Sequence, residues 1–416
     1  MYAFEKRRIV YSEEIKQFPL HFPGNFFGRA IIGWGAIKMV GEACKQAGIK
    51  NALLVSTGLK GTGILDEVQA ISNHAGVKTT LFKVGQTNPR IKDAEDGVKA
   101  YIETEADGII TVGGGTSHDC GKLIRGRMAN QDKDWSEMMA VIDPHFTQTF
   151  IKLNPVTIPQ VSVNTTAGTG AEISGMSIVN DMDKHWKVCV LVANNTPSVG
   201  ITDPAVIRCL PEHLAAATGI DAFVHALEGF VSRLGNQISK GMAWRCAKLV
   251  WENLPEFTYN RWNDKACESM CWAALLGGMS FALGGGTGQI HGLAHQLSAL
   301  DQNLHHGLSN AIMMMPVVKL NYIAAPESYA EFGKYCLEID TKKMTRFEAA
   351  EAAVERMEYL RNAVGITEEK IKLSNYDITE KDCEDMTKYS INSLCYEGNV
   401  RDWTEEDSLN VYKGLL

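Results

Sequence analysis

The sequence predicts an α/β domain built on a parallel sheet, followed by an all-helical domain. Strand-like apolar runs alternate with helical patterns between residues 29 and 115, which is typical of parallel strands joined by crossover helices. After about residue 205 the strand signals fade and helix follows helix. The length of 416 residues exceeds the size at which one core stops growing, so two domains are expected. We place the boundary near Asp203-Pro204, which gives domains 1–203 and 204–416.

The first half holds the predicted sheet and its crossover helices. The expected elements are a helix over Ile37–Ala47 ended by Gly48, strands over 51–57, 77–84 and 108–112, and a helix over Asp93–Thr104 with Asp93 as its N-cap. A further strand-like run covers Ile158–Val163. Glycine-rich segments directly follow two of the strands, at Gly58 and at Gly113. Because ligands of such sheets bind beyond the carboxyl ends of the strands, these turns are candidate binding loops.

The second half is predicted to be helical. Helices are expected from Pro211 onward, and over 240–253, 266–283 and 349–364. The last opens with Thr345-Arg-Phe-Glu348, a capping box, and Gly365 ends it. Its apolar stripe consists of Val354, Met357, Leu360 and Val364.

Composition excludes several classes of protein. A hydrophobic content of 45% and a charged content of 22% are those of a soluble globular protein. The net charge of −8 argues against nucleic acid or an anionic membrane as the main partner. The N-terminus lacks the apolar run of a secretory signal, and we find no bilayer-spanning stretch, so a cytoplasmic location is expected. The ten cysteines form no Cys-x-x-Cys pair and are expected to be reduced, with Cys267 and Cys271 packing within a helix.

Four of the eleven histidines lie between positions 291 and 306. His291 and His295 are four residues apart, so they share one face of a helix. His305 and His306 follow in a loop-like segment before Gly307. Imidazole is the commonest metal ligand in proteins, but any one of these residues alone is as well explained as a polar surface histidine.

An upstream pair strengthens the metal interpretation. Asp221 and His225 are also four residues apart, and Ala, Phe, Val and Leu surround them. Buried ionisable groups need partners or a metal, because an unpaired buried charge is costly. The alternative is a salt-bridged core pair without a metal. Taken together with the later histidines, the pair favours a metal site.

Two loops have the composition of a dinucleotide site. Gly113-Gly-Gly-Thr-Ser-His-Asp119 follows a buried strand and leads into a helical stretch, where backbone N–H groups can approach a pyrophosphate. It is not the G-x-G-x-x-G fingerprint, and a tight turn explains it equally well. The loop 164–170, rich in hydroxyl groups and glycine, suits a ribose or an amide, or is an ordinary Ser/Thr turn.

Five motifs, taken in order, resemble the iron-containing (group III) alcohol dehydrogenase family over almost the whole chain. They are Gly-Gly-Gly-Thr-Ser-His-Asp (113–119), Thr-Thr-Ala-Gly-Thr-Gly (165–170), Thr-Gly-Ile-Asp-Ala-Phe-Val-His-Ala-Leu-Glu (218–228), His-Gly-Leu-Ala-His-Gln-Leu (291–297) and His-His-Gly-Leu-Ser-Asn-Ala (305–311). The stretch Ser56–Gly63 and the doubled His-His-Gly are most similar to the nicotinoprotein methanol dehydrogenase-like members. The resemblance implies a Rossmann-like domain followed by a helical metal-binding domain, the fold shared with dehydroquinate synthase.

The resemblance also assigns site residues. Asp221, His225, His291 and His306 match the metal ligands; His306 is chosen over His305 because the last ligand precedes the glycine that is Gly307 here. Because this chain carries one extra residue between His295 and that glycine, His305 stays open as the alternative. His295 matches a histidine near the metal that relays protons. Gly114, Gly115, Thr116 and Ser117 match the pyrophosphate loop, and Asp119, Thr165, Thr166, Thr169 and Lys187 match positions lining the nicotinamide and its ribose. Cys395 matches the substrate cleft, although Val400 stands where relatives usually have proline.

The implied cofactors are one divalent metal ion and a nicotinamide dinucleotide. Three imidazoles and a carboxylate suit Fe²⁺ or Zn²⁺. In many relatives the strand that matches residues 52–56 ends in an aspartate that accepts a hydrogen bond from the ribose; here Thr57 replaces it and Lys60 is near. We therefore expect NADP(H) to be tolerated beside NAD(H).

The expected function is hydride transfer between a nicotinamide and a small primary alcohol or its aldehyde. Anionic aldehydes such as sulfoacetaldehyde stay open, with Arg125, Arg127 and Arg401 either counter-charges or surface arginines. Two other classes compete: a dehydroquinate-synthase-like lyase, and a structural subunit of a large assembly. Relatives form oligomers, so at least a dimer, or even a decamer, is expected, and the aromatic segment up to Phe27 is either an intersubunit arm or a cover for the domain edge.

Overall fold

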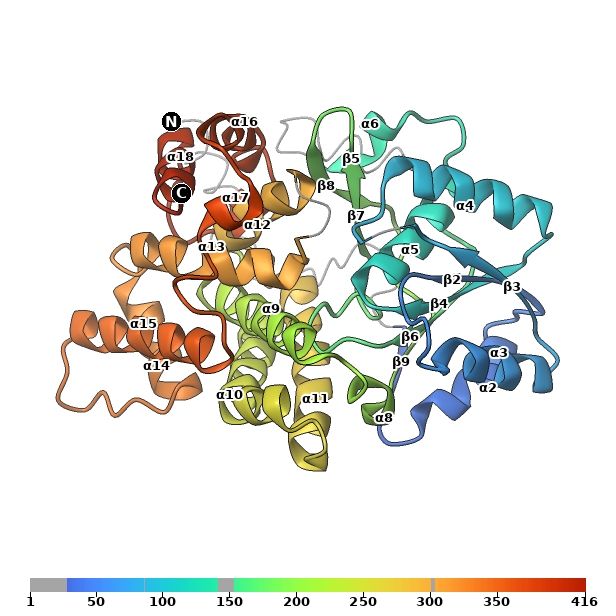
Figure 1. Cartoon of the computed structure of the whole chain (residues 1–416), viewed down its shortest axis with the longest axis horizontal. Helices are drawn as coiled ribbons and strands as arrows, with labels where there is room; N and C mark the ends of the chain where they lie inside the picture. Colours follow the sequence, from blue (N-terminus) through green and yellow to red (C-terminus); the bar gives the residue numbers. More distant parts are fainter. Residues whose placement is uncertain (1–27, 86, 141–152, 301–303) are drawn as a thin grey trace, which may run out of the picture.

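The computed structural model describes residues 28–85, 87–140, 153–300 and 304–416. The aromatic N-terminal segment therefore lies outside the described residues. Figure 1 shows two parts side by side: a sheet with flanking helices on the right, in blue to green, and a set of packed helices on the left, in yellow-green to red. The predicted order of an α/β domain and a helical domain is confirmed.

The larger sheet has six strands, all paired in parallel. They are β1 (Arg29–Ile32), β2 (Asn51–Ser56), β3 (Lys78–Lys83), β4 (Gly108–Gly113), β6 (Gln160–Asn164) and β9 (Val199–Thr202). Their spatial order is β1-β9-β6-β4-β2-β3. The chain runs from β2 outward to β3, and then from β4 in the opposite direction to β6. The order of the strands thus reverses between β2 and β4, which is where ligands of open α/β sheets bind.

Helices cover both faces of this sheet (Figure 1). They are η1 (Ala36–Met39), α2 (Val40–Gln46), α3 (Ile64–His74), α4 (Ile91–Glu103) and α5 (Gly115–Ala129). The short helix α6 (Trp135–Met138) packs in a separate apolar cluster with Val179 and Val188. Leu54 and Ile110 pack with Val40 and Val68 on one face. Leu53 and Ile109 of the same strands pack with other residues on the opposite face. Burial on both faces explains why these strands are continuous apolar runs without alternation.

One local prediction in this domain is wrong. Asp93 is not an N-cap, because α4 is capped by Arg90. The Asp93 carboxylate instead accepts hydrogen bonds from the Arg90 backbone nitrogen, at 2.9 Å, and from its guanidinium. The helix predicted over Ile37–Ala47 is confirmed: it begins as the 3₁₀ turn η1 and continues as α2.

A smaller antiparallel sheet was not predicted. It consists of β5 (Met139–Ala140), β8 (Trp186–Leu191) and β7 (Met176–Asp181), in that order. In Figure 1 it lies above the larger sheet and beside the helical part. This position brings the β7–β8 hairpin to the junction of the two parts, where α12 contacts β8.

From Pro204 on, the described chain is helical. The helices are α8 (Pro204–Ile207), α9 (Glu212–Val231), α10 (Gln237–Tyr259), α11 (Asp264–Ser280), η2 (Phe281–Gly285), α12 (Gln289–Leu300), α13 (His306–Asn321), α14 (Pro326–Cys336), α15 (Arg346–Ala363), η3 (Leu373–Tyr376), α16 (Glu380–Ser390), α17 (Cys395–Gly398) and α18 (Glu405–Lys413). One apolar core joins them and includes Cys267 and Cys271, as predicted. The capping box of α15 is also confirmed. The ten cysteines are free.

Two of these helical segments have the length and apolar composition of a membrane span. They cover Glu212–Val231 and Asp264–Gly285, and 94% and 67% of their most apolar windows are buried inside the structure. Because most of each window is buried inside the protein, these segments are core helices of the fold. The second segment also breaks where one continuous helix was predicted. α11 ends at Ser280, and the π-helical turn η2 that follows contains Gly284, whose φ of 101° is a backbone conformation that residues with a side chain rarely adopt. This turn aims Phe281 at the site described next.

Candidate functional site

A cavity of about 150 Å³ lies where the carboxyl ends of the strands face the helical part. Both parts contribute to its walls. The residues predicted from the sequence that line it are Gly115, Thr116, Asp119, Thr169, Lys187, Asp221, His225, His291, His295, His306 and Cys395. Segments far apart in the chain thus meet at one pocket.

The sheet side of the pocket is lined by residues that follow β3 and β6 and by the start of α5, which follows β4. The loop after β2 lies outside the pocket wall but is hydrogen-bonded to α5. The Thr57 backbone nitrogen donates to Ser117 Oγ at 3.1 Å, and the Thr165 nitrogen donates to the Gly113 oxygen at 2.9 Å. The Asn88 nitrogen likewise donates to Thr116 Oγ1 at 3.1 Å. These hydrogen bonds fix the loops relative to one another.

Close packing explains the glycines at the start of α5. A Cβ atom on Gly114 would lie 2.6 Å from Thr166 Cγ2, and one on Gly115 would lie 3.2 Å from Thr169 Cγ2. The two predicted cofactor loops therefore touch, and a side chain at Gly114 would push them apart. Without side chains there, the N-terminal backbone N–H groups of α5 face the strand ends, an arrangement that attracts anions.

Asp119 and Lys187 line the pocket but already have partners in the protein. Asp119 accepts hydrogen bonds from Lys122 Nζ at 2.9 Å and from the Ile178 nitrogen at 3.2 Å. Lys187, on β8, donates to Asn88 Oδ1 at 2.9 Å and to Ser298 Oγ at 3.2 Å. Burial lowers the pKa of Lys187 to about 8. Both side chains are therefore positioned from several elements at once.

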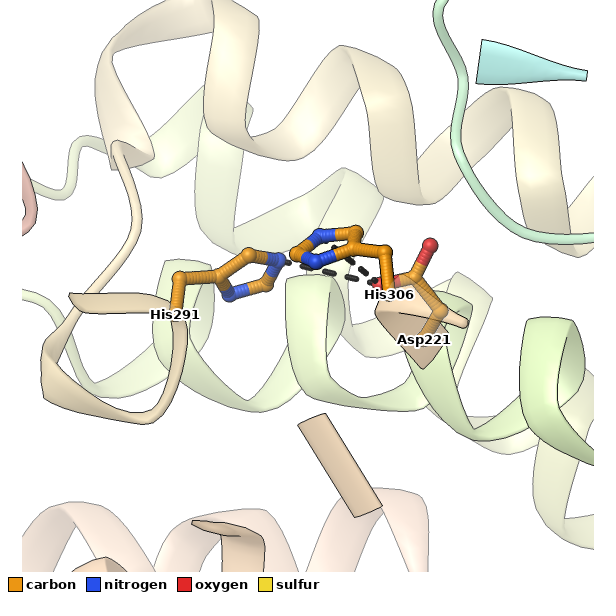
Figure 2. Close-up of side chains that lie close together, drawn as sticks. All are labelled: Asp221, His291 and His306. Carbon is orange, nitrogen blue, oxygen red and sulfur yellow. Dashed lines mark ion pairs between the residues drawn. The ribbon is translucent and has the colours of Figure 1, made fainter. Parts of the chain in front are cut away.

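On the helical side, one carboxylate and two imidazoles converge. Asp221 on α9, His291 on α12 and His306 on α13 each offer an atom, and these atoms all lie within 4.8 Å of one another. Asp221 Oδ1 is 3.8 Å from His291 Nε2 and 3.7 Å from His306 Nε2. Figure 2 shows the three side chains pointing toward a common centre from different helices.

Asn310, one turn along α13 from His306, marks that centre. Its amide nitrogen donates to Asp221 Oδ1 at 2.6 Å and lies 3.1 Å from His291 Nε2 and 3.3 Å from His306 Nε2. One carboxylate oxygen and two imidazole nitrogens thus surround a single amide nitrogen. Asp221 Oδ2 is buried without a hydrogen-bond partner. An acceptor-rich centre of this kind, with an unsatisfied carboxylate oxygen, fits a cation.

The other histidines of the two clusters have different surroundings. His225 is not in the group of three; its ring stacks on that of His291, with ring centres 4.6 Å apart. Burial lowers the pKa of His225 to about 4. The ring centre of His295 is 5.1 Å from that of His306. His305 caps α13, and its Nδ1 accepts from the Gly307 nitrogen at 3.1 Å.

Comparison with known proteins connects this geometry to a family. Residues 28–204 match the iron-containing alcohol dehydrogenase family, and residues 215–416 match the C-terminal region of the Fe-containing alcohol dehydrogenase family. This chain belongs to the iron-containing alcohol dehydrogenase family. It is accordingly an oxidoreductase, and the family implies NAD(H) and a divalent metal ion.

Individual relatives support this membership along the whole chain. NAD-dependent methanol dehydrogenase of Bacillus methanolicus is 30% identical over 397 residues, which cover 94% of this chain and 100% of the relative. 1,3-Propanediol dehydrogenase of Citrobacter freundii is 32% identical, over 94% and 96%. The crystal structure of a 1,3-propanediol oxidoreductase has a TM-score of 0.83 and 30% identity, and covers 93% of this chain and 98% of its own. These relatives do not favour a lyase or a structural subunit.

The arginines that could have served as counter-charges do not line the pocket of this dehydrogenase. Arg125 is buried, not on the surface, and donates to the Ile158 oxygen at 2.7 Å and to other backbone oxygens. Arg127 pairs with Glu95, and Arg401 with Asp407. Their guanidinium groups stabilise the fold.

Cys395 begins α17 at the edge of the pocket. Its Sγ accepts a hydrogen bond from Thr287 Oγ1 at 3.2 Å. Burial raises the pKa of the thiol to about 11, so it is a thiol at neutral pH and not a thiolate. Cys395 thus lies in the wall of the pocket, and its role in a substrate cleft stays a prediction.

Several residues at the site were not predicted from the sequence. The β7–β8 hairpin brings the apolar side chains of Met176, Ile178 and Trp186 to the pocket. The alternation of residues 176–181 and 186–191 around a polar turn was the available signal. Glu228 was also overlooked: it lies seven residues after Asp221 on α9, and therefore on the same face of the helix.

Proposed function

We propose that this dehydrogenase transfers a hydride between NAD(H) and a small, uncharged primary alcohol or its aldehyde. The observation that carries the proposal is that the cofactor loops and the Asp221–His291–His306 group line one cavity. A nicotinamide bound by the cofactor loops would therefore lie next to a substrate oxygen bound near the Asp221–His291–His306 group. The relatives named above act on methanol and 1,3-propanediol, which are small and uncharged.

The proposed metal ligands are Asp221, His225, His291 and His306. The first, third and fourth already point at one centre, and His225 stacks directly on His291. Such an N₃O donor set suits Fe²⁺ or Zn²⁺, and leaves room for a substrate oxygen. The chemistry that a bound divalent ion supplies is Lewis acidity toward that oxygen.

The protein's own groups have the remaining roles in the proposal. Backbone N–H groups at Gly114–Ser117 bind the pyrophosphate, since they lie at the N-terminus of the 15-residue α5. Thr165, Thr166, Thr169, Asp119 and Lys187 bind the nicotinamide and its ribose. His295 exchanges the hydroxyl proton with solvent, because burial keeps its pKa well below the usual range and the neutral ring can both accept and donate.

An uncharged substrate is favoured by the walls of the pocket. Phe281, Trp186, Met176, Ile178 and Leu394 make much of the lining apolar. Among the residues that the structure describes, Lys187 is the one lysine or arginine that lines the cavity, and its amine already donates to two protein oxygens. An anionic aldehyde would therefore bring a charge without a dedicated partner, which is costly to bury.

Several further expectations belong to the proposal. The domains divide at Asp203-Pro204, directly after the last strand. NADP(H) is tolerated beside NAD(H), since Thr57 offers no carboxylate to repel a 2′-phosphate. The enzyme is cytoplasmic and works as a homo-oligomer of at least two chains.

Substrate turnover on metal-analysed protein tests the proposal. Propanal and sulfoacetaldehyde are to be reduced with NADH and with NADPH, and the matching alcohols oxidised. We expect kcat/KM for propanal to exceed that for sulfoacetaldehyde by at least about tenfold, or about 1.4 kcal/mol. A preference for the anionic substrate would contradict the argument from the pocket walls. Failure to turn over any alcohol or aldehyde with either cofactor would contradict the proposed function itself.

A further inference from the structure

Glu228 lies beside the Asp221–His291–His306 group and contacts His291 directly. Its Oε2 is 2.5 Å from His291 Nδ1, and its Oε1 accepts from the Ile290 nitrogen at 2.7 Å. Both oxygens thus have partners in the first turn of α12. Glu228 is 5% exposed, so water does not compete for these hydrogen bonds.

We infer that Glu228 is a positioning residue that holds His291 in the tautomer and orientation required for metal binding. The inference rests on the proposed metal site. An ionised carboxylate can only accept hydrogen bonds, so a neutral His291 must carry its proton on Nδ1. Its Nε2 then presents a lone pair, and this is the atom that lies 3.8 Å from Asp221 Oδ1.

The same carboxylate also fixes where the imidazole stands. Oε1 binds the backbone N–H of Ile290 and Oε2 binds the side chain of His291. The planar carboxylate therefore holds the start of α12 and the imidazole ring in a fixed relative position. The N-terminus of a helix favours a negative charge, which stabilises the carboxylate in this place. Carboxylates that orient metal-binding histidines in this way raise the basicity of the ligand and its affinity for the metal.

Gly288 leaves the space that Glu228 needs. A Cβ atom at this position would lie 2.9 Å from Glu228 Oε1 and 3.3 Å from its Cδ. The residue has no positive φ, so Gly288→Ala adds a methyl group without forcing a left-handed backbone. This variant displaces the carboxylate while keeping its charge.

Glu228→Gln separates the two tasks of the carboxylate. The Ile290 N–H and the His291 Nδ1–H face different oxygens of the carboxylate, so the single oxygen of the amide can occupy only one of the two places and the NH₂ group occupies the other. When its nitrogen faces Nδ1, the imidazole proton moves to Nε2 and the lone pair facing Asp221 is lost. Asp203→Asn is the matched control: Asp203 is also buried and accepts from the backbone nitrogens of Ala205 and Ile37, at 2.9 and 3.1 Å, away from the imidazoles.

The experiment measures Zn²⁺ affinity by chelator competition, thermal unfolding, and the tautomer of His291 by ¹⁵N NMR of the metal-free full chain. We expect Glu228→Gln and Gly288→Ala to bind Zn²⁺ about 10- to 100-fold more weakly than wild type, and Asp203→Asn to bind like wild type even if its Tm falls. Wild-type His291 should carry its proton on Nδ1.

Two kinds of result distinguish what fails. Wild-type protein that binds no stoichiometric Zn²⁺ would overturn the proposed metal site, and this inference with it. If the wild type binds Zn²⁺ normally, three results would overturn this inference but not the metal site. They are a Zn²⁺ affinity of Glu228→Gln within about threefold of wild type, an equal loss of affinity in Asp203→Asn, and a wild-type His291 that carries its proton on Nε2. Should Glu228→Gln fail to fold, Gly288→Ala and the wild-type tautomer still decide.

Discussion

His305 and His306 are neighbours in the sequence, yet their side chains have different tasks. His306 Nε2 lies 3.7 Å from Asp221 Oδ1, whereas His305 Nδ1 accepts from the Gly307 nitrogen at the start of α13. The sequence could name the pair but offered only the following glycine to choose between them. The direction of each ring depends on where α13 begins, and the position of a helix start is rarely fixed by sequence to one residue.

This difference predicts distinct effects of two alanine variants. His306→Ala should lose bound metal and turnover, because one of the converging nitrogens disappears. His305→Ala should keep its metal and lose about 0.5–2 kcal/mol of stability with the helix cap. Metal content after dialysis and thermal unfolding measure both effects. Retained metal in His306→Ala together with loss in His305→Ala would shift the site by one residue.

Asp119 has structural partners in addition to its proposed role in binding the cofactor. Lys122 is fully buried and its Nζ donates to Asp119 Oδ1. Asp119→Ala should thus cost about 3–5 kcal/mol of stability, since it leaves a buried charge unpaired. Asp119→Ala/Lys122→Met should recover most of that stability in denaturant unfolding, while the KM for NAD(H) stays raised and the bound metal stays normal. A double variant with a wild-type KM would remove Asp119 from the cofactor site.

At the scale of elements, the strands of the larger sheet and the long helices were predicted but the hairpin beside the site was not. Runs such as residues 51–56 and 108–112 are largely apolar because both faces of the sheet are covered, and this pattern is visible in the sequence. Strands β7 and β8 mix polar with apolar residues, so their signal in the sequence is weaker, and tertiary contacts with α5 and α12 define them. The break at η2 likewise interrupts a pattern that reads as one helix.

In the proposed cofactor site, the loop after β2 sets which dinucleotide fits. Thr57 directly follows the strand, and Ser117 Oγ accepts a hydrogen bond from its backbone N–H, so the position of Thr57 is fixed. Thr57→Asp should favour NAD(H) further, because a carboxylate accepts from the ribose hydroxyl and repels a 2′-phosphate. The test is the ratio of kcat/KM for NADH and NADPH in both proteins. A wild-type preference for NADH above roughly a thousandfold, about 4 kcal/mol, would contradict the argument from Thr57.

At the scale of the molecule, the site exists only where the two parts meet. The order and type of the domains followed from periodicity, and the motifs named the residues that line the pocket. What no sequence pattern could give is the convergence itself: Asp221, His291 and Asn310 come from three helices whose packing places their polar atoms within hydrogen-bonding reach. Packing of that kind is a property of the complete core.

The sheet and the helical part have separate apolar cores, so we expect removal of the metal to affect these two parts unequally. The sheet packs in clusters that contain none of the proposed ligands, whereas the ligands extend from helices of the large helical core. Metal-free protein should keep its β-sheet, while amide hydrogen exchange rises in α9, α12 and α13. Uniform exchange increases across β2, β4 and β6 would show instead that the ion is needed for the whole fold.

Titration of metal-free enzyme with Fe²⁺ or Zn²⁺, with bound ion and NAD⁺-dependent oxidation of 1-propanol measured on the same samples, tests the central claim most directly. The account predicts that turnover is absent without the ion, rises in proportion to bound ion and saturates at one ion per chain, and that His291→Ala neither retains the ion nor regains turnover. Full activity in metal-free wild-type protein, or in His291→Ala, would contradict it.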